Sequence, residues 1–200
     1  MLIETVILAF LLSFIFRGKI TNISRLHFKG VGLVPLSLAM QGLVYWAAVQ
    51  GISLGGPGVG PFLDTASYVI LLGFALLNRS VAGMGFVALG ILFNGLVVGL
   101  NQGLMPVEPV HLPEMTRQTL LAGQGTHGLL TPSTKLAFLA DRFYISIPKW
   151  GKQLFSVGDL LLDLGVFILI LAQALGRDVS SFGRPRSKAG AARQENSQVP

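Results

Sequence analysis

The sequence has no cysteine and few charged residues. The lack of cysteine in its 200 residues excludes disulfides, thiolate metal ligands and cysteine nucleophiles. Only 12% of the residues are charged, about half the share that is typical of soluble globular domains. The G-x-S-x-G motif of serine hydrolases and the internal repeats of many secondary transporters are also missing. What the chain has instead is hydrophobic residues, which make up 52% of it.

These hydrophobic residues fall into five runs, which predict five membrane-spanning helices. The runs cover residues 2–16, 31–49, 64–77, 81–100 and 157–175. A helix needs roughly 17–25 mostly apolar residues to cross the hydrocarbon core, and fewer where flanking charges reach the headgroups. We therefore expect an all-α, polytopic transmembrane bundle over residues 1–176. The third run is the weakest, and a re-entrant segment there would leave four spans.

The basic residues predict the orientation of this bundle. Ten of the fifteen lysines and arginines lie in the segments 17–29, 79 and 177–193, and the other five lie in the long loop 101–154. Short basic loops stay in the cytoplasm, whereas long loops cross the membrane largely regardless of charge. We expect the N-terminus and the long loop outside, with a disordered, basic tail (177–200) in the cytoplasm. The positive charge then indicates contact with anionic membrane lipids and not with nucleic acid.

The first run resembles a signal peptide only in position. No basic residues precede it, and no A-x-A cleavage site follows it. A retained span is therefore expected. The glycine-rich stretch 51–61 is expected to be an external turn and not a nucleotide-binding loop, because no strand precedes it.

Small residues recur on one face of the fourth run. Gly95, Gly99 and Gly103 are four residues apart, a spacing that lets another helix approach closely. This helix-packing face has two interpretations. It either packs within this chain or docks another subunit.

Carboxylates are expected at the outer ends of the spans: Glu4, Asp64, Asp159 and Asp163. Ionisable groups at membrane depth are costly and are usually paired or functional. For Asp159 the segment 156–159 predicts a variant capping box, with Ser156 as the N-cap residue. Asp163 lies one turn deeper. Asp163 either forms a structural ion pair with a basic residue of the loop (Arg142, Lys149 or Lys152) or belongs to a ligand, cation or proton site.

The long loop is expected to carry short amphipathic helices on the outer membrane surface, around residues 117–122 and 135–144. It also contains His111 and His127. A separation of sixteen residues across glycines is not the spacing of a zinc site, so no metal site and no cofactor are predicted.

Several motifs resemble an uncharacterised family of small bacterial integral membrane proteins, domain of unknown function 5317. They are N-x-G-x-M-P at 101–106, the run from His127 through Asp141 to Pro148, and F-S-V-G-D at 155–159. Gln102 replaces a glycine of the family's N-G-G-x-M-P element, and the turn stays plausible. The resemblance implies a bacterial plasma membrane and about five spans, but no activity.

Two of these motifs flank the long loop, which suggests a site at the outer face. We expect the residues Asn101, His127, Asp141, Asp159 and Asp163 to converge there and to bind a polar ligand, a cation or a partner loop. The alternative is that the same residues only hold the loop in place as a lid.

Three classes of function follow from the sequence. The first is a non-enzymatic accessory subunit of a membrane complex, favoured by the small size and the glycine face. The second is a small-ligand or ion binding or transport component that uses the outward carboxylates. The third is a membrane enzyme acting on lipid-linked substrates, with His127 and Asp141 or Asp159 as acid and base. No catalytic residue is assigned.

Overall fold

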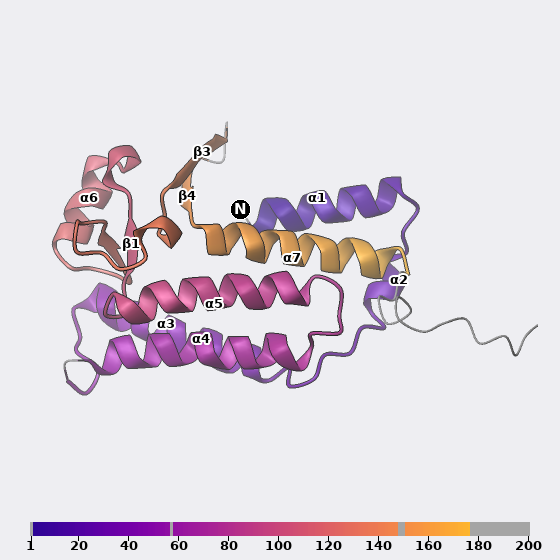
Figure 1. Cartoon of the computed structure of the whole chain (residues 1–200), viewed down its shortest axis with the longest axis horizontal. Helices are drawn as coiled ribbons and strands as arrows, with labels where there is room; N and C mark the ends of the chain where they lie inside the picture. Colours follow the sequence, from indigo (N-terminus) through magenta and orange to yellow (C-terminus); the bar gives the residue numbers. More distant parts are fainter. Residues whose placement is uncertain (1, 57, 148–150, 177–200) are drawn as a thin grey trace, which may run out of the picture.

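Five long helices lie side by side and form most of the molecule (Figure 1). The computed structural model describes residues 2–56, 58–147 and 151–176. The long helices are α1 (Leu2–Ile15), α3 (Leu33–Gln50), α4 (Val59–Leu77), α5 (Met84–Leu100) and α7 (Val157–Ala174). In space their order is α3, α4, α5, α7, α1, so that α1 packs mainly on α7. A short helix, α2 (Ile20–Ile23), also contacts α7.

The segment between α5 and α7 forms a cap over one end of the helices. We call residues 101–147 and 151–155 the cap. It contains the helix α6 (Glu114–Leu121), the short turns η1 (Pro109–His111) and η2 (Ala137–Leu139), and four strands. Strands β1 (Met105–Val107) and β2 (His127–Leu129) pair in parallel, whereas β3 (Phe143–Ile147) and β4 (Gly151–Phe155) form an antiparallel pair.

The strands correct the expectation of a purely helical chain. The segment 117–122 lies largely in α6, as expected. The segment 135–144 is not an amphipathic helix, because it forms η2 and then enters β3. The aromatic and β-branched residues of Phe143–Ile147 favour an extended strand that pairs with β4.

The long helices match the five hydrophobic runs closely. The largest difference is at the third run, where α4 starts at Val59, five residues before the predicted boundary. Three helices (α3, α4 and α7) are long and apolar enough to cross a membrane. Helices α1 and α5 are also apolar but have only 14 and 17 residues. The predicted tail (177–200) lies outside the described residues.

Glycines bring the backbones of α5 and α7 into contact at two levels. Gly90 lies against Gly158, and Gly83 lies against Gly165. The two glycines of each segment are seven residues apart. A Cβ atom at Gly90 would lie 2.5 Å from the carbonyl oxygen of Gly158, far inside van der Waals contact. Only glycine permits this approach.

The predicted glycine face of α5 packs against α4. Cβ atoms at Gly95 and Gly99 would lie 2.9 Å from Tyr68 and 3.1 Å from Thr65, respectively. A Cβ atom at Gly103, just beyond the helix, would lie even closer, 2.5 Å from the Pro61 Cα atom. This face is therefore covered from within the chain.

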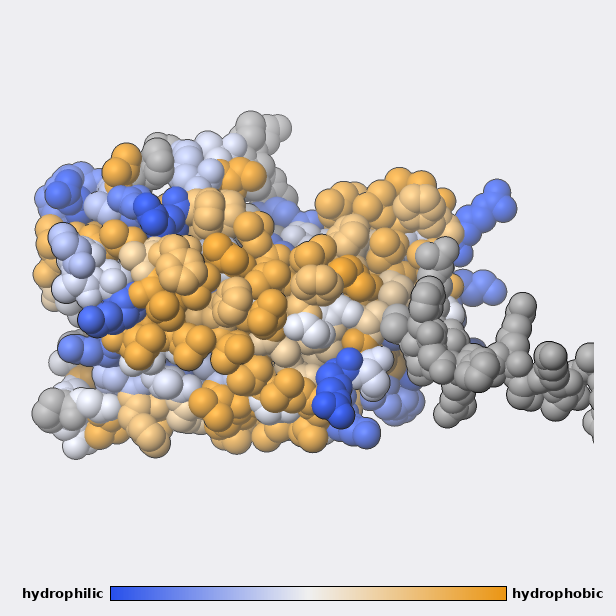
Figure 2. Space-filling view, viewed as in Figure 1, coloured by the Kyte–Doolittle hydropathy of each residue, from blue (hydrophilic) through white to orange (hydrophobic). Residues whose placement is uncertain are grey.

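Hydrophobic side chains cover the outside of the helices. Figure 2 shows them as a broad band over the helices, with hydrophilic side chains gathered around the cap and toward the opposite end. Large apolar side chains in this band are open to solvent, including Phe14 (84% exposed) and Phe62 (70% exposed). A soluble monomer rarely exposes so continuous an apolar surface.

Candidate functional site

A cavity of about 430 Å³ lies where the cap meets the helices. We call it the acidic cavity. Its polar lining residues come from α3 (Gln41, Tyr45), α4 (Asp64, Tyr68), α5 (Asn94), the cap (Thr126, His127, Asp141) and α7 (Asp159). Three of these side chains are carboxylic acids, and within the described part of the chain no lysine or arginine lines the cavity.

Helices α3 and α4 supply one wall of the acidic cavity. Gln41 donates a hydrogen bond from Nε2 to Ser67 Oγ at 2.9 Å, and Ser67 in turn donates to the backbone oxygen of Asp64. Asp64 is only 6% exposed. Within the described residues, no hydrogen bond or ion pair is found for its carboxyl group.

On the opposite wall, a closed polar network joins α5 to the start of α7. Asn94 donates from Nδ2 to Asp159 Oδ1 at 2.8 Å, and its Oδ1 accepts from Ser156 Oγ at 3.0 Å. Ser156 and Asp159 form the predicted capping box, with both reciprocal hydrogen bonds at 2.9 Å. Gly158 allows Asn94 to reach this network, because a Cβ atom at Gly158 would overlap Asn94 Oδ1.

Asp141 is the most constrained acid of the cavity. Its backbone nitrogen donates to Pro106 at 3.0 Å, and its backbone oxygen accepts from Glu108 at 2.9 Å, which fixes it beside β1. The residue is 8% exposed, and its buried Oδ1 atom has no hydrogen-bond partner within the described residues. Burial raises the pKa of Asp141 to about 7, and the negative charge of Asp159 adds to this effect.

His127 lies next to Asp141, with 3.7 Å between Nε2 and Oδ2. It begins β2, which pairs with β1 and so brings it to the same place as Asp141. About half of its side chain (49%) is exposed, because it borders the open cavity. Burial of the rest lowers the pKa of His127 and favours the neutral imidazole.

Asn101 lies outside the acidic cavity and ties the end of α5 to the cap. It donates from Nδ2 to the backbone oxygens of Val97 (2.7 Å) and Lys135 (2.9 Å), and its Oδ1 accepts from the Lys135 nitrogen at 2.9 Å. The following residue, Gln102, has a φ of 59°, a left-handed conformation that favours glycine. The glycine of the N-G-G-x-M-P element that this segment resembles would adopt the same conformation without strain.

Asp163 faces α1 and not the acidic cavity. Its Oδ2 accepts a hydrogen bond from Thr5 Oγ1 at 3.1 Å, and the residue lines a second pocket that shares Asp159 with the acidic cavity. Of its expected basic partners, Arg142 instead lies 3.7 Å from Glu108. Lys149 and the side chain of Lys152 fall outside the described part of the chain.

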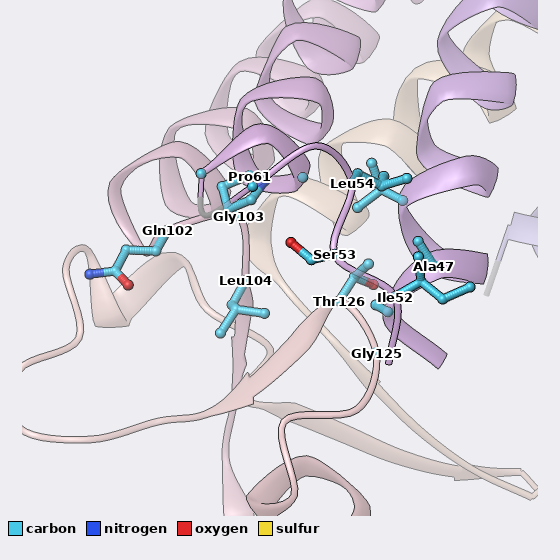
Figure 3. A pocket seen from close by; sticks show the side chains of 15 residues that line it. Ala47, Ile52, Ser53, Leu54, Pro61, Gln102, Gly103, Leu104, Gly125 and Thr126 are labelled. Atoms are coloured by element: carbon cyan, nitrogen blue, oxygen red, sulfur yellow. The ribbon is translucent and has the colours of Figure 1, made fainter. Parts of the chain in front are cut away.

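A smaller, mostly apolar cavity adjoins the acidic cavity at Thr126, which lines both. Its volume is about 230 Å³. Figure 3 shows Ala47, Leu54, Leu104 and their neighbours around it, contributed by the end of α3, the glycine-rich loop and the cap. Ser53, Gln102 and Thr126 are the polar side chains of a mostly apolar lining.

The structure thus brings together three of the five expected site residues: His127, Asp141 and Asp159. Asn101 and Asp163 lie elsewhere. The sequence reading missed Gln41, Tyr68 and Asn94, each a polar or aromatic residue inside an apolar helix. The only available signal was a polar group inside a run long and apolar enough to be expected in a membrane, where such groups are often functional. Within the described residues, no three His, Asp or Glu side chains are arranged to hold a metal ion.

A family model covers residues 25–171, which is most of the chain. The chain belongs to the family of unknown function DUF5317. An uncharacterized protein of Thermotoga maritima is 30% identical to this DUF5317 member over 172 residues, which cover 86% of this chain and 90% of that protein. No solved structure matches the chain.

Both family motifs have structural roles in this DUF5317 member. N-x-G-x-M-P ends α5, makes the left-handed turn and leads into β1. S-V-G-D caps α7 and joins it to Asn94. Each motif therefore positions a wall of the acidic cavity.

Proposed function

We propose that this protein is a multi-pass protein of the bacterial plasma membrane that binds a small organic cation in the acidic cavity. The observation that carries this proposal is the composition of the cavity wall. Asp64, Asp141 and Asp159 line it, and no lysine or arginine among the described residues is there to balance them. A bound cation would supply the missing positive charge, and partial burial would strengthen its attraction to the carboxylates.

The membrane placement rests on the hydrophobic band and the order of the helices. Five apolar helices that alternate in direction would carry the chain across a bilayer five times, with α1 and α5 as short spans. The basic loops at the end opposite the cap favour a cytoplasmic location for that end. The N-terminus, the cap and the acidic cavity would then face outward.

An organic cation fits the cavity better than a bare metal ion does. The volume of about 430 Å³ is within the usual range for small-molecule sites. The rings of Tyr45 and Tyr68 also line the cavity, and aromatic faces attract ammonium groups. A divalent metal would need closely converging ligands, and within the described residues no such cluster of three is found.

This geometry favours ligand binding over the accessory-subunit hypothesis. The glycine face that suggested a docking surface is already covered by α4. A stable co-purifying membrane protein would favour the subunit hypothesis instead. Turnover that depends on His127 would favour the membrane enzyme.

The experiment is a binding titration of the purified protein in lipid nanodiscs. Tetramethylammonium and n-propylammonium serve as probes for quaternary and primary ammonium groups. We expect saturable binding of at least one probe, and a loss of affinity of about tenfold or more in Asp141→Asn, because a charged partner is worth about 1.5–3 kcal/mol. Asp163→Asn is the matched control, since it removes an equivalent carboxylate outside the cavity. Equal loss in both variants, or no binding of either probe, would contradict the proposal.

A further inference from the structure

The acidic cavity gathers three carboxyl groups, and no lysine or arginine of the described residues lines it. Titratable side chains from other elements line the cavity together with Asp141. They include His127 of β2, Asp159 of α7, and Asp64 and Tyr68 of α4. The nearby Arg142 lies beside Glu108, and its ion pair turns it to that carboxylate. Two carboxylates close together in a partly buried space cannot both ionise cheaply unless a positive charge joins them.

Asp141 is the member that cannot relieve this repulsion by moving or by finding a donor. Its backbone is held on both sides, through Pro106 and Glu108. Its Oδ1 atom is buried without a hydrogen-bond partner in the described parts of the chain, and the residue is 8% exposed. Asp159, by contrast, accepts hydrogen bonds on both oxygens, from Asn94 and from the backbone of Ser156. Both carboxylate oxygens of Asp159 thus have donors, whereas Asp141 lacks one on its buried oxygen, which favours the protonated form of Asp141.

We propose that the cavity exchanges a cation for a proton: the Asp141 carboxyl group is protonated when the cavity is empty and gives up its proton when an organic cation binds. This inference rests on the proposed function. The O–H bond of the carboxylic acid breaks, the proton passes to solvent, and the carboxylate that remains pairs with the bound cation. The total charge in the cavity is the same before and after a monovalent cation enters.

His127 is placed to carry the proton between Asp141 and solvent. Its Nε2 atom lies 3.7 Å from Asp141 Oδ2, and about half of its side chain is exposed. Burial lowers the pKa of His127, so that the neutral ring is available to accept a proton at neutral pH. His127 is a positioning and relay residue here, and the cation itself would meet the carboxylates.

The direction of the pKa of Asp141 agrees with this exchange. Burial and the charge of Asp159 raise it to about 7 in the empty cavity. A cation beside the carboxylate would lower it again, because an opposite charge favours the ionised form. Affinity should then increase with pH by up to about tenfold per unit below pH 7 and level off above it, as linkage requires.

The test counts protons by titration calorimetry with tetramethylammonium chloride. This probe carries a permanent charge and no titratable proton, so any proton released comes from the protein. The titration is run in buffers with different ionisation enthalpies, and the dependence of the binding heat on the buffer gives the number of protons. We expect about half a proton per cation at pH 7 and close to one at pH 6, since the pKa is about 7. Almost none should be released at pH 9.

The variants separate Asp141 from the other acids. Asp163→Asn, outside the cavity, should release the same number of protons as the wild type. Asp141→Asn should bind more weakly and release none at pH 6. Proton release that persists in Asp141→Asn would overturn the assignment to this residue. If that variant does not fold, the pH dependence of wild-type affinity still decides, because a pH-independent affinity between pH 5.5 and 8 overturns the exchange.

The outcomes also separate this inference from the proposed function. Binding with a heat that is the same in every buffer would overturn the exchange and leave the cation site in place. Absence of binding to both ammonium probes would overturn the cation site and the exchange together.

Discussion

At the scale of single residues, Asp141 couples the stability of the fold to pH. Its pKa is about 7 in the folded protein and about 3.9 in an unfolded chain. Between these values the unfolded state has lost the proton and the folded state keeps it, so raising the pH destabilises the fold by up to about 1.4 kcal/mol per unit. This loss should stop above pH 7. Unfolding of Asp141→Asn in detergent should lack this part of the pH dependence, whereas exposed Glu114→Gln should retain it.

His127 acts on stability in the opposite direction. Its lowered pKa means that the unfolded state takes up a proton first as the pH falls below about 6.5. The stability that His127 contributes is therefore lost at low pH, and His127→Gln should remove this loss.

The prediction for Asp141 has a clear contrary outcome. If Asp141→Asn and wild type show parallel stability curves from pH 4 to 7, Asp141 is already ionised in the fold.

Asn94 provides a second prediction at the residue scale. Replacing it with alanine removes the donor to Asp159 and the acceptor for Ser156, which leaves buried polar atoms without partners. We expect Asn94→Ala to reduce the free energy of unfolding by about 1–3 kcal/mol. Gln118→Ala, on the exposed helix α6, should change it by less than about 0.5 kcal/mol. Chemical denaturation of both variants in the same detergent makes the comparison, and equal stabilities would contradict the network.

Sequence alone identified some of these residues and missed others for a physical reason. The capping box was predictable, because Ser156 and Asp159 interact locally and their spacing is fixed by helix geometry. Asn94 was not, since its partners are more than sixty residues away and depend on how α5 is rotated against α7. The grouping of His127 with Asp141 depends on the pairing of β1 with β2, which are too short to leave a pattern in the sequence.

At the scale of helices and strands, the glycine contacts between α5 and α7 are the tightest packing in the bundle. A Cβ atom at Gly165 would lie 2.7 Å from the Gly83 oxygen and from the Val87 nitrogen. Gly165→Ala should therefore force the helices apart and cost about 1–3 kcal/mol. Gly73→Ala in α4 is the matched control, because apart from the adjoining backbone of α4 a Cβ atom there would have no neighbour within 4 Å. It should be neutral or stabilise by up to about 1 kcal/mol.

Thermal unfolding of the two alanine variants measures this difference. A Gly165→Ala variant as stable as Gly73→Ala would show that α5 and α7 do not touch through their backbones. The five helices themselves could be predicted from hydrophobic run length, because each run is long, mostly apolar and bounded by polar or glycine-rich segments. The early start of α4 could not, since Asp64 interrupts the apolar run, although it does not interrupt the helix.

At the scale of the whole molecule, the proposed orientation can be tested with the chain's lack of cysteine. Ser133 is exposed in the cap, and Ser24 is exposed at the opposite end. Each Ser→Cys variant would have one thiol and no background from the wild type. A membrane-impermeant maleimide added to intact cells should label Ser133→Cys and spare Ser24→Cys until the membrane is opened. The reverse pattern would contradict the orientation. Labelling of both variants in intact cells would contradict an odd number of spans between the two residues.

The contact between α1 and α7 has a consequence for how the protein is made. α1 packs mainly on α7, and the hydrogen bond from Thr5 to Asp163 joins residues 158 positions apart. Because the ribosome adds residues in order, α1 would, in the proposed membrane placement, enter the bilayer long before its partner has been synthesised. The pairs α3–α4 and α4–α5 could then assemble during translation, whereas α1 would remain among lipids until α7 is made. Assembly of this bundle therefore finishes with its earliest and latest helices together, and a chain that stops before residue 157 leaves α1 as an orphan for quality-control proteases.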